Sequence, residues 1–276
     1  MNDNRKVILW CGNAPNQKAL ANKIAQELNL VGIVIENHTS IKEKTKFGTL
    51  LGKAFDRIFF APLYTSWSIL MNQYHQKFPE WPLVPILKTD KINTQEVVDF
   101  SSKFRPDLIM VSGTRLIKKN LFSTPTSHGF INLHTGLSPY IKGGPNCTNW
   151  CIAEKKFHMI GNTVMWLDAG IDTGNIITTS CLNFSGKESI TEIHVRVMES
   201  AHKLYIRAAK LILEDHPNIP AISQSSIDPG TTYYTKMWGR KQKLRFFMNL
   251  SEFRKSAANG ISNTKSKELT TVPLPE

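Results

Sequence analysis

The chain has 276 residues, of which 41% are hydrophobic and 20% are charged, a balance typical of a globular protein long enough to bury a core. No apolar run approaches the roughly 18 residues of a membrane span, so we expect no transmembrane segment. The apolar run at residues 7–11 equally suits a first strand, which argues against a secretory signal. The cysteines show neither CxxC nor paired zinc spacing, which favours a reducing cytoplasm and predicts no metal site. They are Cys11, Cys147, Cys151 and Cys181.

The formal net charge is +12, and much of it lies near the C-terminus. From Lys236 to Lys267 there are nine Lys or Arg residues against a single acid, Glu252. A solvated basic tail is one interpretation; a phosphate-bearing substrate, an anionic membrane surface and RNA are the others. Because aromatic residues are interspersed with these charges, a further interpretation is an amphipathic helix that docks on a partner.

The first half of the chain alternates short apolar runs with helix-like patterns. Strands are expected at residues 7–11, 31–36, 83–87 and 107–111, and helices at residues 17–28 and 94–103. Such alternation predicts an α/β fold with a doubly wound, mostly parallel twisted sheet flanked by helices. The turn after the first strand lacks the GxGxxG spacing, which excludes a dinucleotide site of that type.

Residues 38–82 form an insert that is basic at first and then aromatic. A stripe of this kind is more typical of a core or an interface than of a ligand platform. Its large side chains are Phe59, Phe60, Tyr64, Trp67, Met71, Tyr74 and Phe78.

The second half is expected to have strands at residues 130–133, 160–167 and 176–179, and helices at residues 146–153 and 189–213. Ser189 and Glu192 have the spacing of a capping box at the start of the longer helix. After Pro217 we expect irregular structure, and the Ser, Thr, Lys and Pro content of residues 262–276 predicts disorder. The chain is thus divided into a catalytic domain, residues 1–215, and a basic C-terminal extension, residues 216–276.

Polar residues interrupt the apolar pattern at Asn132 and His134. Residues i and i+2 of a strand share a face, so this amide and imidazole would lie side by side. Acyl transfer to an amine needs a donor for the developing oxyanion and a group that manages the amine proton. Asp172, in a glycine-rich loop, could fix the imidazole tautomer. Each residue also has an ordinary structural interpretation, as a strand-end histidine, a turn amide or a turn carboxylate.

The ordered motifs resemble those of the folate-dependent formyltransferases, which include glycinamide ribonucleotide transformylase, methionyl-tRNA formyltransferase and amino-sugar N-formyltransferases. The matching motifs are Asn132-Leu-His134, Leu137-Ser-Pro139, Gly143-Gly-Pro145 and Asp168-Ala-Gly-Ile-Asp172-Thr-Gly174. The family often has Arg before the Gly-Gly pair, where this chain has Lys142.

The resemblance implies formyl transfer from N10-formyltetrahydrofolate to a primary amine, with Asn132, His134 and Asp172 as catalytic residues. The cofactor would contact Thr114, Arg115, Leu116 and Ile117 on one side and Leu167, Asp168 and Ala169 on the other. The substrate would contact Gly12, Asn13, Lys142, Gly143, Gly144 and Pro145.

A nucleotide-linked amino sugar of cell-surface polysaccharide biosynthesis is the acceptor that we favour, because its amine and pyrophosphate suit a cationic site. Glycinamide ribonucleotide and methionyl-tRNA are the alternatives within the family, although too few residues follow the long helix for the β-barrel domain of a methionyl-tRNA enzyme. A hydrolytic relative, or an inactive folate- or polyanion-binding module acting through the basic tail, stays open. Binding of nucleic acid is not expected, and a homodimer is one option for assembly.

Overall fold

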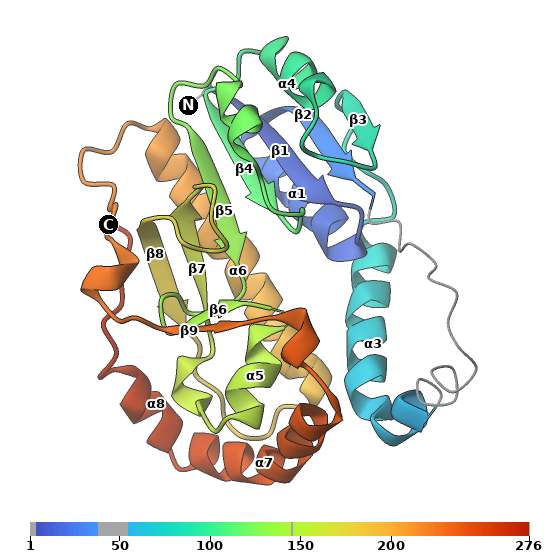
Figure 1. Ribbon diagram of the computed structural model, residues 1–276, viewed down its shortest axis with the longest axis vertical. Helices are drawn as coiled ribbons and strands as arrows, with labels where there is room; N and C mark the ends of the chain where they lie inside the picture. Colours follow the sequence, from blue (N-terminus) through green and yellow to red (C-terminus); the bar gives the residue numbers. More distant parts are fainter. Residues whose placement is uncertain (1–3, 38–54, 145, 276) are drawn as a thin grey trace.

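The computed structural model describes residues 4–37, 55–144 and 146–275, and its centre is one seven-stranded sheet in the order β3-β2-β1-β4-β5-β7-β8 (Figure 1). The first five of these strands are parallel, whereas β7 runs antiparallel to both β5 and β8. The strands are β1 (Lys6–Gly12), β2 (Asn29–Glu36), β3 (Ile86–Thr89), β4 (Leu108–Ser112), β5 (Phe130–His134), β7 (Gly161–Trp166) and β8 (Ile176–Cys181). The predicted mostly parallel α/β sheet is confirmed.

Helices cover both faces of this sheet, as a doubly wound fold requires. Within β1, Val7 and Leu9 belong to the core shared with α1 (Pro15–Glu27) and α6 (Ile190–Leu213). The alternate residues Ile8 and Trp10 belong to the core beneath α4 (Gln95–Ser102) and the 3-10 helix η1 (Lys119–Ser123). Because both faces are buried, the strand is a continuous apolar run rather than an alternating one.

The long helix α6 begins at the predicted capping box. The Ser189 hydroxyl accepts the Glu192 backbone N–H, and the Glu192 carboxylate accepts the Ser189 N–H. Two backbone donors that a helix start leaves unpaired are thereby satisfied.

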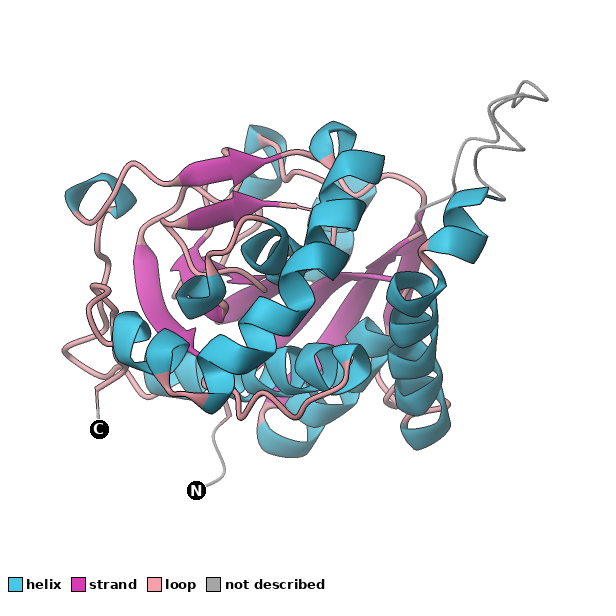
Figure 2. Cartoon of the chain, turned by 90° about the horizontal axis from the view of Figure 1, so that it is seen from below, coloured by secondary structure: helices cyan, strands magenta, loops and turns pink. Residues whose placement is uncertain are grey.

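The insert contributes one long helix, α3 (Ala61–Lys77), that stands at the edge of the molecule (Figures 1 and 2). One of its faces buries Leu70 and Tyr74 against α1 and α6, and the Tyr74 hydroxyl donates to Glu199 at 2.8 Å. This face is core, as the aromatic spacing predicted. Tyr64 and Trp67 are about 40% exposed. Residues 38–54 of the insert lie outside the described residues.

The C-terminal extension is ordered, which contradicts the expected irregular structure. Its elements are η3 (Gln224–Ser226), β9 (Thr231–Tyr233), η4 (Thr235–Met237), α7 (Arg240–Ala258) and α8 (Ile261–Ser266). Strand β9 pairs with β6 (Ile141–Gly143), and α7 packs on α5 (Cys147–Ala153), followed in the chain by η2 (Phe157–Met159). Helix α7 is amphipathic: Phe246 and Phe253 are fully buried, while its basic residues are exposed except for Lys243, which is 9% exposed.

The expected disorder of residues 262–276 also conflicts with the structure, in which residues up to 275 are described. The Thr179 N–H donates to the Val272 carbonyl, and the Val272 N–H donates to the Thr179 hydroxyl, both at 2.8 Å. Val272 is buried beside β8. This pairing depends on a distant strand edge, which composition does not reveal. The domain boundary at residue 215 stays a prediction. None of the helices in the described ranges is long and apolar enough to cross a membrane.

Candidate active site

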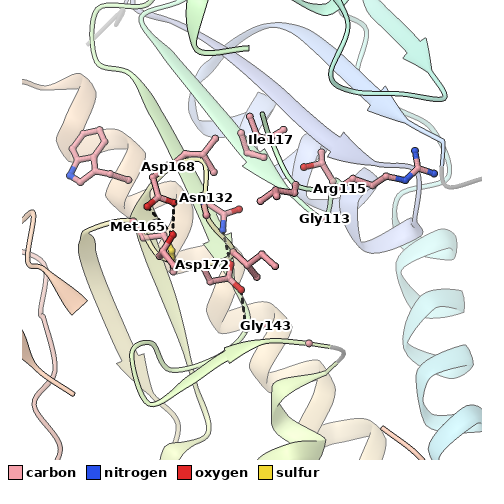
Figure 3. Close-up of a pocket in the computed structure, with 18 of the residues that line it drawn as sticks. Gly113, Arg115, Ile117, Asn132, Gly143, Met165, Asp168 and Asp172 are labelled. Carbon is pink, nitrogen blue, oxygen red and sulfur yellow. Dashed lines mark hydrogen bonds between the residues drawn. The ribbon is translucent and has the colours of Figure 1, made fainter. Parts of the chain in front are cut away.

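The predicted catalytic residues converge at the carboxyl end of β5. Asn132 Nδ2 donates to Asp172 Oδ1 at 3.2 Å, and His134 Nδ1 lies 3.3 Å from Asp172 Oδ2. The Gly143 backbone N–H donates to the same Oδ2 at 3.1 Å (Figure 3). One carboxylate, which lies 40 positions after Asn132 and 29 after Gly143, therefore joins the amide, the imidazole and the glycine turn.

The loop that carries Asp172 is held by hydrogen bonds from Gln224 and by others within the loop itself. Asp172 has a positive φ of 51°, a conformation that non-glycine residues adopt only where surrounding contacts impose it. The buried Gln224 side chain supplies such contacts, because its Nε2 donates to the Asp172 and Gly174 carbonyls, both at 2.8 Å. Within the loop, Asp168 accepts from Thr173 Oγ1 at 2.8 Å.

His134 is buried, and both of its ring nitrogens face acceptors. Nε2 lies 3.1 Å from the Ile141 carbonyl oxygen and 3.7 Å from Cys147 Sγ. Burial alone would lower the pKa of His134, but the Asp172 carboxylate, Cys147 and the Ile141 carbonyl raise that pKa well above its ordinary value. An imidazolium donates from both nitrogens, so this setting favours the protonated form.

A cavity of about 330 Å³ opens beside these residues, and we call it the Asn132 cavity. Both Asn132 and Asp172 line it. Of the predicted cofactor contacts, it brings together Thr114, Arg115, Leu116, Ile117, Leu167 and Asp168. Two loops thus face each other across the ends of the strands, where an open α/β sheet binds ligands.

The loop at residues 113–117 is fixed by Glu36, which is fully buried at the end of β2. Its carboxylate accepts the backbone N–H of Arg115 at 2.7 Å, the Arg115 guanidinium at 3.1 Å and the Ile92 N–H at 3.0 Å. The Arg115 side chain is consequently directed away from Asn132 (Figure 3).

Several predicted residues lie elsewhere. Gly143 and Gly144 line the Asn132 cavity, whereas Ala169, Gly12, Asn13 and Lys142 are absent from its described lining. Asn13 donates to the Asn37 side chain at 3.4 Å, and the Lys142 ammonium donates to the Pro229 carbonyl at 3.3 Å. These side chains are engaged by neighbouring segments. Pro145 lies outside the described residues.

Other residues of this site were missed in the sequence. Tyr233, Tyr234 and Thr235 of the extension line the Asn132 cavity because β9 pairs with β6 beside it. Glu36 was missed as well. In the sequence, the tyrosines are visible only as a pair after Gly230, and Glu36 only as a carboxylate at the end of an apolar run. Neither signal indicates a partner.

A doubly wound sheet with an amide, an imidazole and a carboxylate at its strand ends defines a class of proteins suited to acyl transfer. The family model described as formyl transferase matches residues 5–209. The chain belongs to the formyl transferase family.

A curated relative, methionyl-tRNA formyltransferase of Clostridium tetani, is 31% identical over 135 residues, which are 48% of this chain and 42% of the relative. The match thus spans less than half of that protein. The N-formyltransferase of Helicobacter canadensis, solved with folinic acid and dTDP-3-aminofucose, superposes with a TM-score of 0.55 at 12% identity, covering 91% of this chain and 82% of that one. Glycinamide ribonucleotide transformylase 1 of Symbiobacterium toebii gives 0.52 at 15% identity, covering 78% and 90%. These structural likenesses establish the shared fold.

Proposed function

We propose that the chain is an N-formyltransferase that moves a formyl group from N10-formyltetrahydrofolate to the primary amine of a nucleotide-linked amino sugar. The observation that carries this proposal is the joint engagement of Asn132, His134 and Gly143 by the Asp172 carboxylate at the wall of a cavity. Membership of the formyl transferase family supports the same reaction.

The Asn132 cavity has the features that a pterin ring needs. Leu116, Ile117 and Leu167 give apolar surfaces for the flat ring, and the backbone of residues 113–117 offers polar groups at its edge. Ligand sites commonly combine such apolar walls with a few fixed polar groups. Glu36 fixes Arg115, which keeps this edge rigid.

When bound, the folate supplies the formyl carbon that the acceptor amine attacks, and its N10 leaves with one proton. Asn132 lines the cavity, and its NH2 group gives one hydrogen to Asp172 and offers the other to the developing oxyanion. Removing one such donor typically costs about a hundred- to a thousandfold in turnover.

Asp172 also lines the cavity, and its carboxylate accepts the proton that the amine loses and passes it to the leaving nitrogen. His134 is not part of the described cavity lining, and it acts through Asp172, whose charge its imidazolium balances. This assignment differs from the sequence-based expectation, in which the imidazole of His134 manages the amine proton and Asp172 fixes its tautomer.

The test is absorbance monitoring of formyl-folate turnover with a panel of amines: dTDP-linked 3- and 4-amino sugars, glycinamide ribonucleotide and charged initiator tRNA. His134→Ala would run beside His75→Ala, a matched change at an exposed position of α3. We expect turnover with an amino sugar that His134→Ala abolishes and His75→Ala retains. Turnover only with the ribonucleotide or tRNA would overturn the acceptor, and turnover without any amine would indicate a hydrolase.

A further inference from the structure

A second and larger cavity, of about 780 Å³, borders the same catalytic segments. Asn132 and Gly144 line the Asn132 cavity, while Thr135 and Asn146, which are close in sequence to these two, line the second one. Its remaining walls come from α3, α5, α6 and α7 and from Arg57 and Trp238, which precede α3 and α7, and we call it the α3–α7 cavity. Ligand sites of about 300–1,000 Å³ enclose most of a drug-sized molecule, so the volume suits a nucleotide-linked sugar.

The insert and the extension supply the aromatic and cationic parts of this cavity. Tyr64 and Trp67 come from α3, and Trp238 from the segment before α7. The Lys243 ammonium is held by the Tyr64 hydroxyl at 2.9 Å and by Asp56 Oδ2 at 3.0 Å. Aromatic faces stack on sugars and bases, and a fixed cation favours a phosphate-bearing ligand.

His194 of α6 belongs to the lining and carries a buried hydrogen-bond acceptor. It is only 4% exposed, and its Nε2 lies 3.0 Å from Asn149 Oδ1, an oxygen that can only accept. Nε2 therefore carries the proton and Nδ1 is left as an acceptor, for which the described residues offer no hydrogen-bond partner. Burial lowers the pKa of His194 to about 4, so the ring stays neutral near pH 7.

A neutral, buried acceptor selects for a ligand group that donates. Leaving such an atom unsatisfied is unfavourable, and a ligand hydroxyl can recover part of this cost. Sugar hydroxyls donate, whereas the oxygens of an ionised phosphate do not. The chemistry of His194 thus complements that of Lys243: one suits the glycosyl hydroxyls and the other the diphosphate.

We propose that the α3–α7 cavity binds the acceptor, with a glycosyl hydroxyl on His194 and the diphosphate near Lys243. The aromatic base packs against Trp67. The inference rests on the proposed formyl transfer and assigns its acceptor specificity to the insert and the extension, two regions whose roles the sequence left open.

The experiment uses the full chain with a dTDP-linked 3-amino sugar and its 4-amino isomer as probes. The variants are Trp67→Ala and Lys243→Met, each paired with a control on the same helix. Ile69→Ala is matched to the first, because Ile69 is 41% and Trp67 40% exposed, and Lys241→Met is matched to the second. His194→Phe is added to test the acceptor atom. The readouts are KM and kcat for the amino sugar, calorimetric Kd for the amino sugar alone, and Kd for 5-formyltetrahydrofolate.

We expect the cavity variants to raise KM and Kd for the amino sugar at least about tenfold, equivalent to about 1.4 kcal/mol, and to leave folate binding within about twofold. Both control variants should match the parent protein. Unchanged amino-sugar binding in Trp67→Ala and Lys243→Met, or no binding of either probe by the parent, would overturn the inference. If formyl transfer occurs and KM is unaltered in all variants, only the cavity assignment is overturned. If the parent binds the probes and the variants weaken this binding, but no protein shows turnover, only the proposed reaction is overturned.

Discussion

Replacing Asp172 by Asn tests the arrangement on which the proposed reaction depends. The carboxylate accepts the Asn132 amide, the Gly143 N–H and the His134 ring, at 3.1 to 3.3 Å. An amide of the same shape keeps one acceptor oxygen but turns an NH2 group toward another donor. Hydrogen bonds to charged groups contribute about 1.5–3 kcal/mol each. A net loss of about 3 kcal/mol would lower kcat roughly a hundredfold, since each 1.36 kcal/mol is a factor of ten.

The pH profile of formyl transfer separates this explanation from a general loss of folding. In the parent protein, Asp172 keeps the pKa of His134 well above its ordinary value, so the ring stays protonated through neutral pH. Without the carboxylate charge, the pKa of His134 falls, because burial lowers it and the strongest group that opposes burial is gone. The residual activity of Asp172→Asn should therefore fall at a lower pH than that of the parent, which holds its activity through neutral pH.

Asp99→Asn is the control, because Asp99 is an exposed carboxylate on α4 that bonds only locally to Gln95 among the described residues. It should match the parent in kcat and in pH profile. If Asp172→Asn keeps full activity with an unshifted profile, the carboxylate does not organise the site and the reasoning is refuted.

Three further outcomes can be measured. Glu36→Gln removes the charge that holds the Arg115 N–H and guanidinium, so Kd for 5-formyltetrahydrofolate should rise about tenfold in a fluorescence titration; an unchanged Kd would contradict this. Tyr205→Phe removes a buried hydroxyl that accepts the Val111 N–H at 2.7 Å, which should cost about 1–3 kcal/mol and lower the calorimetric Tm by about 2–4 °C per kcal/mol; an unaltered Tm would contradict it. Burial lowers the pKa of His202 to about 3 in the folded protein. Below about pH 6.5 the unfolded chain therefore binds more protons at this residue than the folded one does. The free energy of unfolding consequently decreases as the pH falls from about 6.5 toward 3. His202→Gln should make Tm less dependent on pH between about 7 and 5, and parallel curves for variant and parent would argue against a neutral buried ring.

The sequence alone determined the features that depend on short-range periodicity. Apolar runs alternating with helical patterns specified the parallel sheet, because strands buried on both faces need continuous apolar residues. Asn132 and His134 could be paired because the two-residue repeat of a strand fixes their common face. The capping box at Ser189 involves residues three positions apart, so it could also be predicted from the sequence.

Only the tertiary structure decided what surrounds that site. Gln224 reaches the Asp172 loop, and β9 brings Tyr233 to the cavity, through contacts between residues far apart in the sequence. The extension has a strongly basic composition, which predicted a tail, yet the apolar face of α7 buries Phe246 and Phe253. Propensity and composition report on local preferences, whereas the partner of an amphipathic face is chosen by packing across the whole fold, and no window of the sequence contains both partners.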